Sequence, residues 1–320
     1  MSRLLRGAST PDADRGGREI VDPAEAWESP VPGSTVSRVP PSARMAGFLA
    51  PTSDADLPAG VLRTLRFVCG SLPVDRCLVL PASTRPIDRS CRRYVTGDRQ
   101  VLGFGERATG LWVDGRGRDP VAVVQVDRIG AIEDLAVLSY RRLSVRAADV
   151  RLSVRYAAHS RPLLAAPLAW LRRRIEGEAR GEVPWLGLRT VGTGAVPEEW
   201  RAVADDVARV GGEPGVAMLF GLVPERLGEG RARGVLVAVT SAELVVLAES
   251  DGTTIRTGAW PQALVVPRRT LQQAREGGDR LLLRSAGVDR VLRLGPQLAA
   301  AAVELIDCAG PARRVIRSAG

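Results

Sequence analysis

The sequence predicts an α+β protein that is mainly β and is built from two copies of one module in tandem. A signature of alternating arginine and apolar residues occurs twice, as RLSVRAADV at 142–150 and as RLLLRSAGV at 280–288. Short runs that alternate or are continuously apolar, as β-strands do, precede each copy. An apolar stretch with helical spacing follows each copy. A strand–turn–strand–helix ending that occurs twice in one chain indicates a duplicated module.

The first module is predicted to span residues 58–178. A short helix is expected at 57–68, and the strand-type runs lie at 77–80, 101–104, 110–113, 121–126, 136–140, 142–146 and 151–156. Leu164, Leu168, Leu171 and Ile175 lie on one stripe of the helix that closes the module. Pro167 is expected to kink that helix or to mark its start, because proline cannot donate the helical hydrogen bond.

The second module is predicted at 196–310, after a connection at 176–195. Pro197, followed by Glu198 and Glu199, predicts a helix start, since proline suits the first turn and acids suit the positive end of the helix dipole. Further strands are expected near 216–222, 235–239, 244–248, 263–266, 280–284 and 288–294. The closing helix is expected from Pro296 to about residue 310.

This order of strands resembles bacterial pleckstrin-homology-like (PH-like) domains. The stretches that carry the resemblance are VQVDRIGAIED at 124–134 and YRRLSV at 140–145 in the first module, with WPQALVVP at 260–267 and RLLLRSAG at 280–287 in the second. The resemblance implies two tandem bent β-barrels, each closed by a C-terminal helix, and a non-catalytic binding or scaffolding role. Lipid-binding members carry a basic motif in their first hairpin. Residues 81–93 do not match that motif, so no inositol-lipid site is inferred.

Residues 1–57 are rich in Pro, Gly, Ser, Asp and Arg and are predicted to be a disordered tail, in which Trp27 is a candidate docking residue. The chain shows neither the apolar core of a signal peptide nor an uninterrupted apolar run of membrane-spanning length. Cys69, Cys77, Cys91 and Cys308 lack the spacing of a zinc site and suggest reduced thiols. A cytoplasmic location, free or peripheral to a membrane, is therefore expected.

Composition argues against several classes of chemistry. The chain contains no lysine and a single histidine, His159, and no nucleophile motif accompanies that histidine. Schiff-base, P-loop and Ser-His-Asp chemistry all need residues that the sequence does not supply in a recognisable pattern. The sequence therefore predicts no catalytic residue, no cofactor and no metal site, and favours a protein that is not an enzyme.

The candidate binding site is a set of arginines on the first module's signature hairpin. Strand alternation places Arg142 and Arg146 on one side of their strand, and Arg151 and Arg155 on one side of the next. With a net charge of +9, this side predicts an anionic partner. The partner classes, in order of preference, are an acidic protein, an anionic membrane surface and nucleic acid. Two alternative functions stay open: a nucleic-acid-associated regulator and an enzyme that uses carboxylates.

Overall fold

The computed structural model describes residues 50–51, 57, 60–81, 83–86, 93–116, 120–137, 140–176, 187–192, 195–210, 217–224, 232–249 and 261–309. Apart from residues 50, 51 and 57, the predicted tail lies outside the described residues, and so do Trp27 and Cys91. Most of the 81–93 stretch and of the predicted connection also lie outside them.

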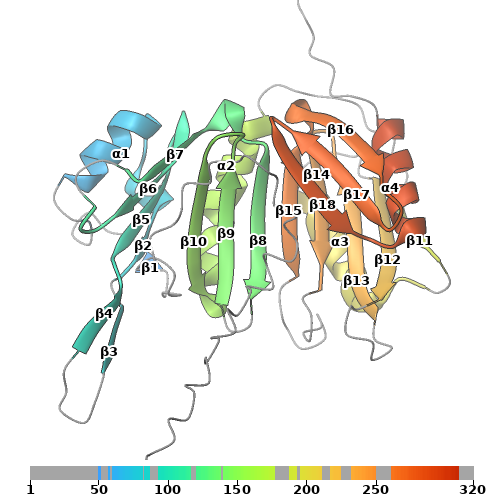
Figure 1. The fold of residues 1–320 in the computed structure, drawn as a ribbon, viewed down its shortest axis with the longest axis horizontal. Helices are drawn as coiled ribbons and strands as arrows, with labels where there is room; N and C mark the ends of the chain where they lie inside the picture. Colours follow the sequence, from blue (N-terminus) through green and yellow to red (C-terminus); the bar gives the residue numbers. More distant parts are fainter. Residues whose placement is uncertain are drawn as a thin grey trace, which may run out of the picture.

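The first half begins with a helix on a small antiparallel sheet (Figure 1). Helix α1 (Val61–Cys69) lies where a helix was predicted, and its buried residues Leu65 and Cys69 pack on the sheet. The sheet has the order β1-β2-β5-β6-β7. Its strands are β1 (Ala50–Pro51), β2 (Cys77–Leu80), β5 (Gln100–Phe104), β6 (Ala108–Val113) and β7 (Ala122–Gln125). A separate hairpin, β3 (Ser83–Pro86) with β4 (Arg93–Gly97), was not predicted.

Three long strands and a helix complete the first half. They are β8 (Ala131–Val137), β9 (Tyr140–Arg146), β10 (Arg151–Ala157) and α2 (Arg161–Glu176), with short 3-10 turns η5 (Val126–Arg128) before β8 and η6 (Ala158–Ser160) before α2. Pro167 lies inside α2, so it does not mark the helix start. Strand β8 begins five residues earlier than predicted, within the VQVDRIGAIED stretch.

The second half begins with β11 (Gly187–Val191), which lies in the predicted connection, and α3 (Glu198–Val210). Strands β12 (Ala217–Pro224), β13 (Ala232–Val239), β14 (Glu243–Ala248) and β15 (Gln262–Pro267) follow. After the turn η8 (Arg268–Thr270) come β16 (Leu271–Glu276), β17 (Arg280–Ser285), β18 (Val288–Arg293) and α4 (Pro296–Ala309). Among the described helices, none combines the length and the apolar character needed to cross a membrane.

The two halves repeat one order of elements. In each half a run of antiparallel strands leads through a 3-10 turn, η5 or η8, to three more strands and a closing helix, α2 or α4. The prediction of two PH-like barrels is nevertheless wrong, because the sheets are open. The order β10-β9-β8-β15-β14-β13-β12-β11 forms one eight-stranded sheet that crosses from one half to the other.

Pairing between β8 and β15 joins the halves. Ala263, Leu264 and Val265 of β15 pair antiparallel with Asp134, Glu133 and Ile132 of β8. An unpaired strand edge leaves backbone donors and acceptors without partners. Here the backbone groups at the edge of β8 pair with those at the edge of β15. In a barrel, the first and last strands of one sheet would pair with each other instead.

The core lies in layers on both sides of the eight-stranded sheet. Helices α2 and α3 lie behind it in the view of Figure 1 and cover one face, where apolar residues of both halves form one cluster. The sheet β16-β17-β18 and helix α4 cover the other face over β12–β15. That second layer reaches β8, where Arg290 of β18 contacts Glu133, but its strands do not lie over β9 and β10 in Figure 1. The arginines predicted as a binding site lie on the side of β9 and β10 that faces away from α2.

Candidate functional site: the arginine face of β8–β10

The predicted arginines lie side by side on the outer side of β9 and β10. Arg146 pairs with Arg151, and Arg142 pairs with Arg155, in the antiparallel register of the two strands. Ser144 and Ser153 pair between them, with their hydroxyl oxygens 3.2 Å apart. We call these six residues, together with Glu133 of β8, the arginine face. Alternation along the strands turns Leu143, Val145, Leu152 and Val154 the other way, into the core under α2.

Glu133 is the carboxylate at the centre of the arginine face. It is 4% exposed and lies beside Ser144 in the register of β8 and β9. Arg146 donates from Nε to Glu133 Oε2 at 3.0 Å, and Arg290 of β18 forms an ion pair with the other carboxylate oxygen. Arg290 comes from the second half of the chain. No local signal in the sequence connects a residue of β18 with the hairpin of β9 and β10.

The charges of the arginines control the ionisation of Glu133. Burial by itself acts to raise the pKa of this carboxyl, since it disfavours the charged form. The positive charges of Arg290, Arg146, Arg151 and Arg142 outweigh burial and hold the pKa of Glu133 below its ordinary value. Four guanidinium groups thus act on one buried carboxylate.

Asp134, the next residue, points to the opposite side of β8. Its carboxylate accepts hydrogen bonds from Tyr156 Oη at 2.6 Å, Arg141 Nε at 2.9 Å and Arg161 Nε at 3.1 Å. Arg141 also donates to the carbonyl oxygen of Pro261 at 2.9 Å. Burial and the neighbouring Asp134 charge raise the pKa of Tyr156. This network ties β8, β9, β10 and α2 together and is separate from the arginine face.

The second copy of the signature is organised differently. In β17 and β18, Arg284 pairs with Asp289 at 2.6 Å, and Arg293 forms an ion pair with Asp279. These pairs are largely exposed to solvent, where ion pairs contribute little to stability. Leu282 stands where the first copy has Ser144. Only the first copy therefore concentrates arginines around a buried carboxylate.

The arginine face is suited to binding anions. Guanidinium groups are planar and donate paired hydrogen bonds that match phosphate and carboxylate oxygens. Like charges on adjacent strands cost stability unless acids or bound anions offset them. Arg151 and Arg155 are half-buried on β10, the edge strand of the eight-stranded sheet. Arg155 also lies over the ring of Tyr140, 5.1 Å from its centre. Binding by these four arginines stays a prediction.

Other residue types considered for chemistry do not form a centre in the described part of the chain. His159 is exposed in the turn η6. Cys69, Cys77 and Cys308 are not joined in disulfides, and burial raises the pKa of Cys69 to about 12, so that thiol stays protonated at neutral pH. Among the described residues, no group of three or more His, Cys, Asp or Glu could hold a metal ion.

Comparison with known proteins identifies an enzyme among the relatives. No family model matches the chain. The methionyl-tRNA formyltransferase of Pelotomaculum thermopropionicum is 30% identical over 162 residues, which make up 47% of this chain and 51% of that relative. The chain therefore spans about half the length of the relative that it matches.

This comparison corrects two expectations from the sequence. The resemblance to PH-like domain proteins is wrong, because no family model supports it and the relative found is an enzyme of another kind. The expectation that the protein is not an enzyme is overturned by the same relative. Both expectations rested on strand order and on missing motifs, and neither of these is specific to one family.

Proposed function

We propose that this protein binds RNA through the arginine face. The observation that carries the proposal is the concentration of Arg142, Arg146, Arg151 and Arg290 around Glu133. The rows Arg146–Arg151 and Arg142–Arg155 lie four residues apart along the strands, which corresponds to roughly 13 Å at the usual rise of a strand. Arg142 and Arg146 are buried, so a nucleic-acid strand would contact each row through its half-buried member on β10, Arg151 or Arg155.

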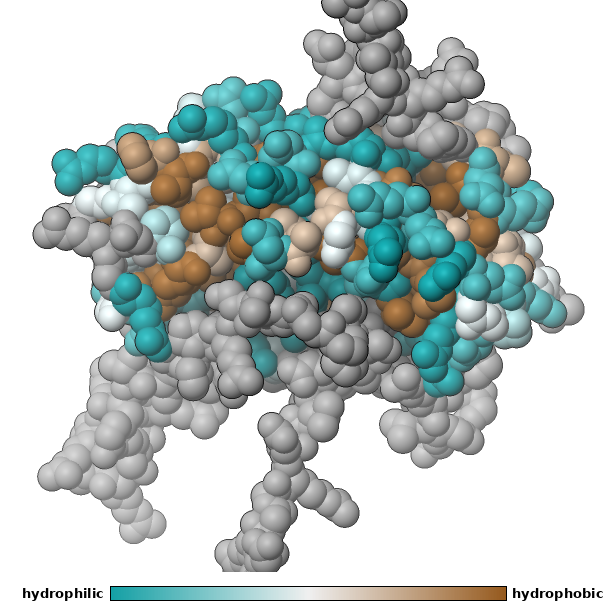
Figure 2. Space-filling model, turned by 45° about the horizontal axis from the view of Figure 1, so that its top comes forward, coloured by the Kyte–Doolittle hydropathy of each residue, from teal (hydrophilic) through white to brown (hydrophobic). Residues whose placement is uncertain are grey.

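Three observations favour RNA over a membrane or an acidic protein. The relative acts, by its name, on a transfer RNA. The net charge of +9 favours phosphate-rich partners in general. The hydrophobic residues visible in Figure 2 form several separate patches among hydrophilic ones. A surface that inserts into lipid would instead present its apolar residues together.

The test is binding of the full chain to transfer RNA, measured by fluorescence anisotropy at about 50 and 200 mM salt. The variant Arg151→Gln with Arg155→Gln changes two half-buried residues on an edge strand and leaves Arg146 and Arg290, which pair with Glu133, in place. We expect at least tenfold weaker binding and a salt dependence reduced by about two phosphate contacts. The control is Arg280→Gln with Arg284→Gln, which removes the same number of charges from two exposed arginines of β17 in the second half.

Three outcomes would overturn the proposal. The first is no binding to RNA by the unchanged protein. The second is stronger binding to acidic vesicles than to RNA under the same conditions, which would assign the face to a membrane surface. The third is equal weakening by the control variant, because binding would then depend on net charge and not on this face.

The relative supports a second candidate function, the transfer of a formyl group to an aminoacyl-tRNA. The test is incubation of the protein with methionyl-tRNA and a formyl donor, followed by detection of formylmethionine. Formation of this product at a rate proportional to protein concentration would support the second candidate. Binding of transfer RNA without product would leave RNA binding as the function.

A further inference from the structure

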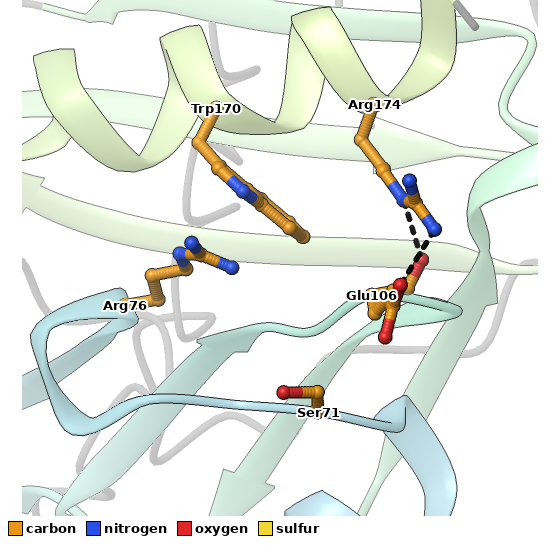
Figure 3. Close-up of a pocket in the computed structure, with 5 residues that line it drawn as sticks. All are labelled: Ser71, Arg76, Glu106, Trp170 and Arg174. Carbon is orange, nitrogen blue, oxygen red and sulfur yellow. Dashed lines mark hydrogen bonds and ion pairs between the residues drawn. The ribbon is translucent and has the colours of Figure 1, made fainter.

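A cavity of about 280 Å³ lies between α2 and the loops that bound the first sheet. Figure 3 shows its lining residues, Ser71, Arg76, Glu106, Trp170 and Arg174. Trp170 and Arg174 are one turn apart on α2, so both side chains leave the helix on the same side. The other three come from the loop after α1, the turn η4 and the loop between β5 and β6.

An aromatic ring and an ion pair face each other across this cavity. The guanidinium carbon of Arg76 lies 4.0 Å from the centre of the Trp170 ring, a cation–π contact. Arg174 donates from Nη2 to Glu106 Oε1 at 2.8 Å, and both side chains are about half exposed, at 49%. In Figure 3 Arg76 lies on one side of the indole and the Arg174–Glu106 pair on the other.

We propose that this cavity binds a single nucleotide. Its base stacks on the indole face turned away from Arg76, as bases stack on aromatic side chains in single-strand recognition. An amino or imino group at the edge of the base donates a hydrogen bond to Glu106. The phosphate accepts hydrogen bonds from Arg174, whose guanidinium is solvent-accessible.

The lining supports a nucleotide over a purely apolar or purely anionic ligand. An apolar ligand would cover the ion pair of Arg174 and Glu106 without offering it a hydrogen bond in place of water. A simple anion would make no use of the indole ring. The volume lies just below the usual range for small-molecule sites, which is suited to one base with its phosphate.

The proposal does not depend on the arginine face. None of the five lining residues belongs to that face. Helix α2, which carries Trp170 and Arg174, covers the inner side of β8–β10, while the arginines lie on the outer side. A free nucleoside monophosphate and an unpaired nucleotide of an RNA chain offer the same chemistry here, and the experiment separates them.

The experiment titrates the full chain with AMP, GMP, CMP and UMP, and separately with a five-nucleotide single-stranded RNA, while tryptophan fluorescence is recorded. The variants are Trp170→Leu, which removes stacking, Trp170→Phe, which keeps an aromatic ring, and Arg174→Gln. The matched control is Arg173→Gln, the neighbouring exposed arginine of α2, which does not line the cavity. Thermal melting of each variant confirms that it is folded.

We expect Trp170→Leu to weaken binding about 5- to 150-fold, the range for loss of one stacked base. Trp170→Phe should retain most of the affinity, Arg174→Gln should lose at least fivefold, and Arg173→Gln should bind like the unchanged protein. Binding of the mononucleotides identifies a site for a free nucleotide. Binding of the oligonucleotide alone identifies a site for a unit of RNA. Either result supports the proposal.

Two results would overturn the proposal: no binding of any nucleotide or of the oligonucleotide, or binding by folded Trp170→Leu or by Arg174→Gln that equals binding by the control. If Trp170→Leu fails to fold, Arg174→Gln alone decides the second result. The variant Arg151→Gln with Arg155→Gln separates the two proposals. It should lose transfer-RNA binding and still bind mononucleotides in a manner that depends on Trp170.

Discussion

Glu133 organises the arginine face at the scale of single residues. Its two carboxylate oxygens contact arginines from different halves of the chain, Arg146 on β9 and Arg290 on β18. A buried carboxylate that holds several guanidinium groups fixes their positions before any ligand arrives. This preorganisation lowers the entropy cost of binding, because long side chains otherwise lose rotamer freedom in the complex.

Glu133→Gln should destabilise the protein by about 3–5 kcal/mol at pH 7, because it leaves the buried charges of Arg146 and Arg290 without their carboxylate. The pKa of Glu133 is lowered in the folded state. Its contribution is therefore fully present above the unfolded pKa, about 4.3, and is lost as the pH falls through the lower folded pKa. Urea unfolding of both proteins at several pH values measures the difference, which should shrink in acid.

The control for this prediction is Asp279→Asn. Asp279 forms ion pairs with Arg293 and Arg280 at the exposed turn of β17. Exposed pairs contribute little, so this variant should unfold at nearly the same urea concentration as the unchanged protein. A difference between Glu133→Gln and the unchanged protein that stays constant from pH 7 into acid would contradict the role given to Glu133.

The sequence was sufficient to group residues that are close along the chain. Alternation placed Arg142, Arg146, Arg151 and Arg155 on one side of a hairpin, and the register of β9 and β10 has them there. It could not add Arg290, because that contact joins residues 157 positions apart. The nucleotide cavity was missed for the same reason, since its five residues come from four separate segments.

At the scale of elements, α3 packs on the sheet through an apolar face that includes Trp200 and Ala204. Trp200 is buried and packs against Phe220 of β12, with ring centres 5.4 Å apart. A Cβ atom added to Gly234 of β13 would lie 2.4 Å from Trp200 Nε1, closer than real Cβ atoms approach. No local pattern in the sequence indicates which strand lies against Trp200.

Gly234→Ala should therefore destabilise the protein by about 1–3 kcal/mol, the usual cost of overpacking. Thermal or urea unfolding measures this loss. Combining it with Trp200→Phe removes the atoms that clash, so the double variant should lose less than the sum of the two single losses. Additive losses would mean that the two residues do not compete for the same space.

Short strands at sheet edges were the elements that the sequence did not reveal. Strand β11 lies in the predicted connection, and it joins the eight-stranded sheet by parallel pairing with β12. Strand β16 carries LQQARE, in which exposed polar residues interrupt the apolar pattern. Edge strands with little buried surface give weak periodicity. The longer, buried strands β12 to β15 lay close to their predicted positions because their apolar runs are continuous.

At the scale of the whole molecule, several features join the halves besides the arginine face. One is the pairing of β8 with β15. Another is an ion pair in which Arg172 of α2 donates from Nε to both carboxylate oxygens of Glu243, at 3.1 and 2.9 Å. The Glu243 side chain is 1% exposed. The apolar cluster under α2 and α3 also contains residues of both halves.

These contacts predict that the two halves unfold together, although the chain repeats one order of elements. Calorimetry should show a single transition, because opening either half would expose the edge of β8 or β15 and the shared apolar cluster. Arg172→Gln leaves the buried Glu243 without its guanidinium and should lower the melting temperature by several degrees, since about 1 kcal/mol shifts it by 2–4 °C in chains somewhat smaller than this one. Arg173→Gln, exposed one residue away, should leave it unchanged. Two separate transitions in the unchanged protein, with only one of them sensitive to Arg172→Gln, would show instead that the halves are independent units and that the continuous sheet contributes little to their coupling.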